Sequence, residues 1–239
     1  MDVVGVDGCR AGWFAVALGS GRNWAIDVYK TIDELWNAIN SPSMMLIDIP
    51  IGLPDSNKRI CDLQARKLLG HRGSSVFAVP CRKALKAKSY RQACRINNQV
   101  LGFQISIQTW NIAAKIKEVD TWLQNTQSAQ RRVRESHPEL CFWALAGKHA
   151  MAQSKKTEQG FTERFSILLK NFSQTENIVE QALERFRRKD LARDDILDAL
   201  VLAVSARFSA GKPKTVPPTP PVDEKGRPME IVYPPARFI

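Results

Sequence analysis

The first fifty residues constrain the fold most, because they predict three strands, a helix and a fourth strand in that order. Three apolar runs are separated by glycine-containing turns, which is typical of an antiparallel meander. These runs are Val3–Val6, Trp13–Leu18 and Trp24–Tyr29. Thr31 has the pattern of an N-cap, and apolar residues at helical spacing predict a helix over 32–39. The continuous apolar run Met44–Ile47 then predicts a buried central strand reached by a crossover.

The rest of the chain predicts helices, one further strand and an extended tail. Helical patterns run from 59 to about 125, including one long amphipathic run over 107–123, with a loop at 70–80. A short strand is expected at 131–135, and helices are expected over 140–146, 163–170, 178–187 and 195–208. Eight of the 13 prolines lie between 213 and 235, so this part is expected to be extended, and 229–233 can return as an edge strand. We predict a domain over 1–210 with a helical insertion at about 55–125, followed by a proline-rich tail over 211–239.

Composition excludes several classes of protein. With 44% hydrophobic and 25% charged residues, the chain can bury a core and is expected to be globular. No apolar run approaches the roughly 18 residues that a membrane span needs, so we expect no membrane partner. Residues 1–7 hold two aspartates and no Lys or Arg, unlike a signal peptide, which predicts a cytoplasmic location. The five cysteines form no CxxC pair, so we expect reduced thiols and neither a disulfide framework nor a zinc knuckle.

Positive charge is concentrated in one segment. Of the net charge of +11, residues 55–95 carry +9, with eleven Lys and Arg against two Asp. A concentrated basic segment favours nucleic acid as a partner, either DNA or RNA, and Phe77 and Tyr90 are available for stacking on bases. The alternative is that these charges only solvate exposed helix faces.

Carboxylates occur where buried elements are expected to end. Asp7 follows the first strand, Asp48 follows the fourth, and Glu135 ends the strand at 131–135. Asp195 and Asp198 are three residues apart, hence on one face of a helix whose other sides are apolar. Buried carboxylates are costly unless a positive charge neutralises them, and a metal ion is one source of that charge.

The alternative for the last helix is that its acids only cap it. We expect this role for Asp194, which precedes the helix. For Asp195 and Asp198 the capping and helix-dipole explanation is weaker, because Asp198 lies about a full turn inside the helix.

Acidic oxygens suit Mg²⁺ or Mn²⁺, and two such ions supply what phosphodiester hydrolysis needs without a protein nucleophile. The sequence contains no GxSxG, Walker or GxGxxG motif. His137, next to Glu135, is either a proton shuttle or a loop residue whose ring is bound by backbone groups.

Five segments together resemble a known family. VGVDGCRAGW (4–13), IDIPIGLP (47–54), RGSSVFAVPCR (72–82), ESHPELCF (135–142) and DDILDALVLA (194–203) resemble the predicted ribonuclease H-like nucleases grouped as domain of unknown function family 429. The resemblance covers nearly the whole chain. The DILDAL segment is also similar to the last helix of Holliday-junction resolvases, in which an Asp pair at this spacing binds metal.

The resemblance implies a ribonuclease H-like α/β fold and a role for each motif residue. Asp7 would bridge two metal ions, Asp48 would share one, and Asp195 with Asp198 would complete the cluster, while Glu135 is the least secure ligand. The residues that would contact substrate phosphates or bases are Arg10, Trp13, Arg72, Ser74, Ser75 and Arg82.

Three functions are therefore weighed. The leading hypothesis is a metal-dependent nuclease in which Asp7, Asp48, Glu135, Asp195 and Asp198 bind Mg²⁺ or Mn²⁺, and His137 belongs to the substrate-binding set. The second is a non-catalytic nucleic-acid-binding protein of the same fold. The third, a phosphotransferase of the actin and sugar-kinase kind, is disfavoured because the chain has one copy of the domain and no second glycine-rich phosphate loop.

Overall fold

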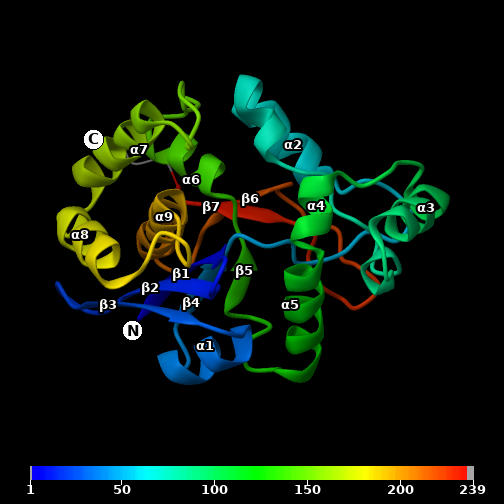
Figure 1. Ribbon diagram of the computed structural model, residues 1–239, viewed down its shortest axis with the longest axis horizontal. Coiled ribbons are helices and arrows are strands. Elements are labelled where there is room, and N and C mark those ends of the chain that lie inside the picture. Colours follow the sequence, from blue (N-terminus) through cyan, green and yellow to red (C-terminus); the bar gives the residue numbers. More distant parts are fainter. Residues whose placement is uncertain (1, 236–239) are drawn as a thin grey trace.

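A five-stranded mixed sheet lies at the centre of the computed structural model, which describes residues 2–235 (Figure 1). Its strands are β1 (Val3–Cys9), β2 (Gly12–Leu18), β3 (Trp24–Tyr29), β4 (Met44–Ile47) and β5 (Val133–Glu135), in the spatial order β3-β2-β1-β4-β5. The first three strands are antiparallel, and β4 pairs in parallel with β1 and β5. The predicted meander followed by a parallel strand is confirmed, and the protein is an α/β protein.

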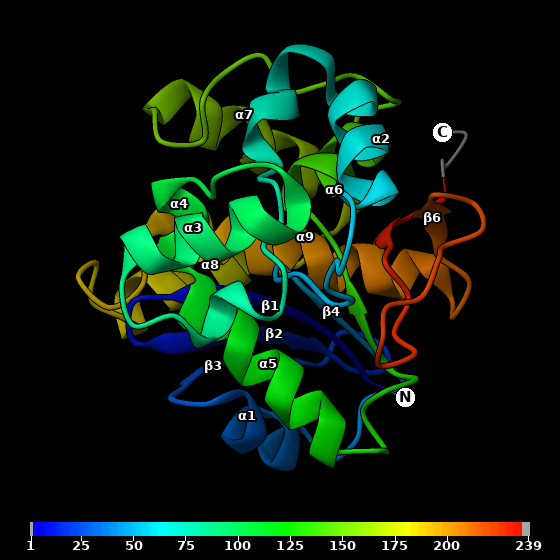
Figure 2. The ribbon, with the colours of Figure 1, turned by 90° about the vertical axis from the view of Figure 1, so that its right-hand side faces the viewer.

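Helices cover both faces of the sheet. They are α1 (Ile32–Ile39), α2 (Ile60–Leu69), α3 (Tyr90–Leu101), α4 (Ile107–Asn111), α5 (Ala113–Asn125), α6 (Pro138–Leu145), α7 (Glu158–Asn171), α8 (Thr175–Arg185) and α9 (Arg193–Ser209). Figure 2 shows α9 crossing one face of the sheet, with α1 and α5 on the other face. The apolar core accordingly has two main parts, one shared by the sheet with α6 to α9 and the other with α1 and α5.

Alternation along β1 sends neighbouring side chains to opposite faces. Val4 and Val6 belong to the core on the α1 and α5 side, whereas Gly5 faces α9. A Cβ atom on Gly5 would lie 2.1 Å from the carbonyl oxygen of Ala199 and 2.2 Å from the backbone nitrogen of Ala203. The missing side chain therefore lets α9 lie directly on β1, and this contact brings the first turns of α9 over the carboxyl end of that strand.

Several helix boundaries differ from the prediction. The amphipathic run over 107–123 is two helices, because Ile112 leaves the helical conformation with φ −100° and ψ 0°. Part of the expected loop at 70–80 is a 3-10 helix, Gly70–Ser75, and a second one covers Ala84–Lys86. Helix α7 begins at Glu158 rather than 163, because the Thr157 hydroxyl accepts the Gly160 N–H and caps it (3.1 Å).

The proline-rich tail returns to the body of the protein. Strands β6 (Lys214–Val216) and β7 (Ile231–Tyr233) form a separate antiparallel pair, and Val232 bridges Ser136 just beyond β5. The predicted strand at 229–233 is present over 231–233, but it pairs with β6 in a separate sheet and touches the five-stranded sheet through this bridge rather than as an edge strand. Within residues 2–235, no helix combines the length and the apolar character needed to cross a bilayer.

Candidate functional site

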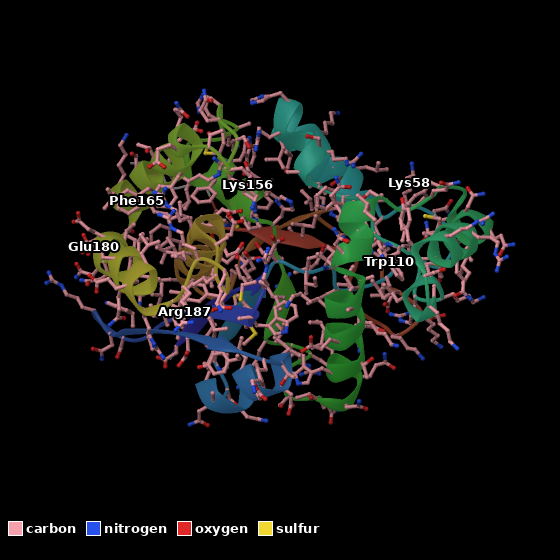
Figure 3. The ribbon with its side chains drawn as sticks, in the orientation of Figure 1. Lys58, Trp110, Lys156, Phe165, Glu180 and Arg187 are labelled. Carbon is pink, nitrogen blue, oxygen red and sulfur yellow. The ribbon has the colours of Figure 1, made fainter. Side chains whose placement is uncertain are left out.

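A cavity of about 450 Å³ lies at the carboxyl ends of β1 and β4. Both acidic and basic side chains line it, and they come from the sheet, from α2, α5, α6 and α9, and from the segments before α2, after α2 and before α7. Lys156 and Trp110, labelled in Figure 3, lie on the α9 side and on the α4 side of this region. Ligands of open α/β sheets commonly bind beyond the carboxyl ends of the strands, which makes this cavity the candidate site.

Two of the predicted acids come from neighbouring strands of the sheet. Asp7 lies in β1 and accepts a hydrogen bond from the Gly8 N–H (2.8 Å). Asp48 directly follows β4, and its N–H continues the pairing of the two strands by donating to the Val6 carbonyl (3.0 Å). Burial raises the pKa of Asp7 well above its usual value, and the nearby carboxylates of Asp48 and Asp198 raise it further. The structure thus brings together carboxylates from β1, β4 and α9.

The acids of α9 have three different environments. Asp195 accepts the Ala192 N–H (3.0 Å), so it closes the first turn as the capping alternative expects. Asp194 was predicted to cap the helix. Instead, the N-cap is Ala192, and Asp194 forms an ion pair with Lys156 (2.6 Å). Asp198 is 1% exposed, and burial raises its pKa to about 6 although the Lys155 ammonium opposes this.

Lys155 is the cation nearest to the acid cluster. Its ammonium forms an ion pair with Oδ2 of Asp198 and lies 3.7 Å from Asp194. The other oxygen of Asp198, Oδ1, is buried and has no hydrogen-bond partner among the described residues. Sequence analysis missed Lys155 and Lys156, because a pair of lysines before a helix carries no signal that it faces an acidic site.

Glu135 has a different role from the predicted one. Both of its oxygens accept hydrogen bonds from the buried guanidinium of Arg59 (2.6 and 2.7 Å), and Oε2 also accepts the Ile51 N–H (2.6 Å). Arg59 is held as well by Asp62 (2.5 Å). The Glu135 carboxylate is therefore committed to a buried ion pair, and we remove it from the set of candidate metal ligands.

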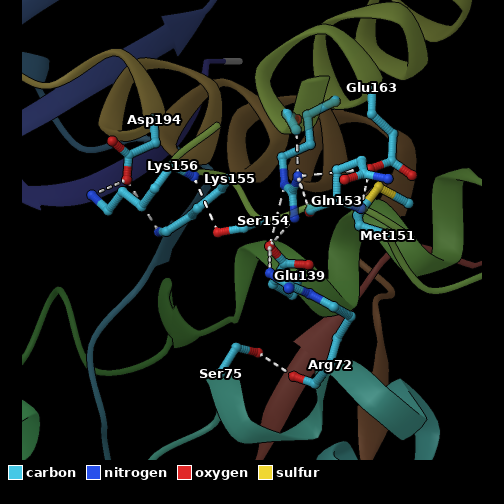
Figure 4. Close-up of polar contacts among 12 residues, drawn as sticks. Arg72, Ser75, Glu139, Met151, Gln153, Ser154, Lys155, Lys156, Glu163 and Asp194 are labelled. Atoms are coloured by element: carbon cyan, nitrogen blue, oxygen red, sulfur yellow. Dashed lines mark hydrogen bonds and ion pairs between the residues drawn. The ribbon is translucent and has the colours of Figure 1, made fainter. Parts of the chain in front are cut away.

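Three of the predicted substrate-binding residues line the cavity. Arg72 points toward Glu139, with 3.8 Å between Nη2 and Oε1, and the hydroxyl of Ser75 donates to the Arg72 carbonyl (2.8 Å; Figure 4). His137 Nε2 lies 3.2 Å from the Ser75 carbonyl. Within residues 2–235, Arg72 Nε, His137 Nδ1 and Glu139 Oε2 are buried atoms without a hydrogen-bond partner. The cavity wall thus has unused hydrogen-bonding capacity that a polar ligand can satisfy.

The other predicted substrate-binding residues lie elsewhere. Trp13 is fully buried on the opposite face of the sheet, donates to Glu118 (3.1 Å) and does not line the cavity. The guanidinium of Arg82 is engaged by acidic side chains of the protein itself, and Arg82 does not line the cavity, so its contact with substrate stays a prediction. These partners are Asp120, Asp223 and Glu224. Arg10 and Ser74 are exposed but do not line the cavity, so their contact with substrate stays a prediction.

The acid cluster is not arranged around a metal position. Among residues 2–235, no group of three or more His, Cys, Asp or Glu side chains has the geometry to hold a metal ion. The chemistry of the donors nevertheless suits a hard cation, because Asp7, Asp48 and Asp198 offer carboxylate oxygens and repel one another. One oxygen of Asp198 is in addition paired with the ammonium of Lys155.

Comparison with known proteins gives one match. A family model described as "Protein of unknown function (DUF429)" matches residues 5–222. No curated protein and no solved structure matches the chain.

Proposed function

Since the chain belongs to the DUF429 family, whose description names no activity, we propose from the site that it is a metal-dependent nuclease that hydrolyses phosphodiester bonds in nucleic acid. The proposal rests on one observation above all: Asp7, Asp48 and the α9 acids Asp194 and Asp195 line a single cavity at the carboxyl edge of the sheet. The buried carboxylate of Asp198 lies close enough to raise the pKa of Asp7. The strand order β3-β2-β1-β4-β5 is compatible with a ribonuclease H-like fold, which we include in the proposal.

Asp7, Asp48 and Asp198 are the residues that would hold Mg²⁺ or Mn²⁺, with Asp195 beside them. When bound, the cation would activate water and stabilise the leaving oxygen of the phosphodiester. One oxygen of Asp195 already accepts a hydrogen bond from the Ala192 N–H, so Asp195 has less capacity for a cation than Asp198. Oδ1 of Asp198 has no hydrogen-bond partner among the described residues.

The remaining cavity residues suit the binding of a phosphate-containing substrate. Because His137 Nε2 faces the Ser75 carbonyl, which can only accept a hydrogen bond, that nitrogen carries a proton, and Nδ1 has no hydrogen-bond partner among residues 2–235. His137 lines the cavity and can form a hydrogen bond with a substrate hydroxyl. Arg72 and Lys156 supply positive charge at the cavity for a phosphate group.

The basic segment over 55–95 supports a polyanionic substrate. Three of its eleven cations, Arg59, Arg72 and Arg82, form ion pairs with acids of the protein itself. Most of the others, including Lys67, Arg91 and Arg95, are exposed. Phe77 lines the cavity and is 39% exposed, which leaves an aromatic face available to a nucleobase.

The test is cleavage of single-stranded DNA, duplex DNA and RNA by the purified chain in Mn²⁺, Mg²⁺ or chelator. We expect cleavage only with a divalent cation. Asp7→Asn should reduce it by at least about 100-fold, because even neighbours of metal ligands cost about 10- to 100-fold when mutated. The matched control is Asp33→Asn, which removes an exposed carboxylate from α1 and should leave the rate unchanged.

Equal cleavage by Asp7→Asn and wild type would contradict the proposal. Salt-dependent binding of nucleic acid without any cleavage, unaffected by chelator, would favour the second hypothesis, a non-catalytic nucleic-acid-binding protein. The ion pair between Lys155 and Asp198 is the observation that favours that alternative, since it neutralises the acid without a metal.

A further inference from the structure

Residues 63–117 contain no acidic side chain. This stretch has eleven Lys and Arg and not one Asp or Glu. Two of its cations, Arg72 and Arg82, pair with acids from other parts of the chain. Arg91 and Arg95 are exposed and have no acidic partner among the residues that the structure describes. The stretch therefore brings positive charge to the surface that the described part of the protein does not neutralise.

A groove of about 610 Å³ lies along α3, and we call it the α3 groove. Arg91 and Arg95 are four residues apart, which places them on one face of the helix, and both line the groove. The exposed amides of Asn98, Gln99 and Gln104 line it as well, and each can donate and accept hydrogen bonds. Arginine and amide side chains are typical partners of phosphate oxygens in complexes with nucleic acid.

The helix that carries this groove is held in one position. The side chain of Asn97 is buried under α3 and accepts the N–H of Cys81 (2.8 Å). The hydroxyl of Tyr90 donates to the Ile105 carbonyl (3.0 Å), and its ring packs on Trp110 of α4 with 6.3 Å between the ring centroids. Tyr90 nevertheless stays 37% exposed and lines the groove, so its ring is available to a nucleobase.

The α3 groove and the cavity lie on different sides of α4. Thr109 and Asn111 of α4 line the cavity, whereas Trp110 packs on Tyr90 at the groove. Figure 1 shows α3 on the far side of α4 from the sheet. A helix with its side chains is about 10–12 Å across, which corresponds to about three to four nucleotides at roughly 3.4 Å each. Only a strand longer than this can occupy both places at once.

We propose that the α3 groove binds the phosphate backbone of a nucleic-acid strand whose reacting phosphodiester lies in the cavity. The backbone carries one negative charge per nucleotide, which complements a groove with two unpaired guanidinium groups and no acid among its described residues. The inference rests on the proposed function and extends it, because the substrate is then a strand of more than about four nucleotides. DNA and RNA share this backbone, so both should bind the groove.

The test is the binding of a labelled single strand of about 12 nucleotides, as DNA and as RNA, to the full chain. Fluorescence anisotropy is measured in chelator, which prevents metal-dependent cleavage, at several salt concentrations. The variant carries Arg91→Gln together with Arg95→Gln. Each phosphate contact with a single strand contributes about 0.7 to the slope of log K against log salt, so the slope should become shallower by about 1.4. The same slope predicts about 25-fold weaker binding in roughly 0.1 M salt, and a difference that vanishes toward about 1 M.

The matched control carries Arg187→Gln together with Arg188→Gln. It removes the same charge from two exposed residues, and Figure 3 shows Arg187 near α8, on the opposite side of the molecule from α3. Charges farther away than about 10 Å are largely screened in roughly 0.1 M salt, so the control should bind within about twofold of wild type.

The outcomes separate this inference from the proposed function. If the α3 variant keeps the affinity and salt slope of wild type, or if the control loses as much, the inference is overturned and the nuclease proposal stands on its own cleavage test. If the α3 variant alone binds more weakly but wild type cleaves nothing with any divalent cation, the α3 groove is supported and the nuclease proposal fails. If wild type binds neither strand, both proposals fall.

Discussion

The close contact between β1 and α9 predicts a large effect of the smallest substitution, Gly5→Ala. The added Cβ would lie 2.1 Å from the Ala199 carbonyl oxygen and 2.2 Å from the Ala203 nitrogen, whereas ordinary contacts of a Cβ atom are 3.4–4 Å. The helix would have to move away from the strand by more than about 1 Å. Overpacking of a core costs about 1–3 kcal/mol, and we expect about 3 kcal/mol or more here because both clashing atoms are backbone atoms.

Urea and thermal unfolding followed by circular dichroism measure this loss. For a chain of this size, 3 kcal/mol corresponds to a fall of roughly 6–12 °C in Tm. The matched control is Gly19→Ala, because the nearest atom to its new Cβ belongs to the exposed side chain of Asp2 (3.1 Å), which can rotate away. The control should unfold close to wild type.

A second substitution tests whether the clash is with the backbone of α9 rather than with a side chain. Ala203→Gly removes a side chain from the same contact but leaves the clashing backbone atoms, so it should not rescue Gly5→Ala. Wild-type stability of Gly5→Ala, or its rescue by Ala203→Gly, would refute the direct backbone contact. Displacement of α9 should also reduce any cation-dependent activity, because Asp198 would move relative to Asp7.

Three further predictions concern stability. Burial opposes ionisation of Asp223, but hydrogen bonds from backbone N–H groups and from Arg82 outweigh burial and lower the pKa of Asp223 below the usual 3.8. The ionised carboxylate therefore stabilises the fold above about pH 4, and this stabilisation is lost as the pH falls through the pKa of the folded state. Asp223→Asn should therefore lower the free energy of unfolding at pH 7 by about 1.5–3 kcal/mol, with a smaller difference from wild type at pH 3 in urea unfolding. Glu135→Gln should cost about 1–3 kcal/mol in the same assay, because Arg59 loses one of two carboxylate partners, and an unchanged unfolding curve would contradict the buried ion pair. Thr31→Ala should cost about 1 kcal/mol by loss of the cap on α1, and a neutral effect would mean that the cap adds no stability.

The local elements and the positions of the acids could be predicted from the sequence. Hairpin spacing and apolar runs predicted β1 to β4, and Thr31 with its downstream apolar stripe predicted α1. Two acids near the carboxyl edge of β1 and β4 were also predicted, since parallel neighbouring strands end at the same edge of a sheet, although β1 runs on to Cys9 and so contains Asp7 rather than ending before it. These features depend on residues close together in the chain, so periodicity and turn chemistry were sufficient.

The partners of the site residues depended on tertiary structure. Glu135 meets an arginine 76 positions earlier in the chain, Arg59, and Asp198 meets a lysine 43 positions earlier, Lys155. Trp13 lies on the opposite face of the sheet from the cavity, although its motif neighbour Asp7 reaches the site. The sequence by itself determined which elements form and where the carboxylates stand along them. Only the folded chain decided which cation neutralises each carboxylate, because contacts between distant residues depend on how helices pack across the sheet and leave no periodic signal in the sequence.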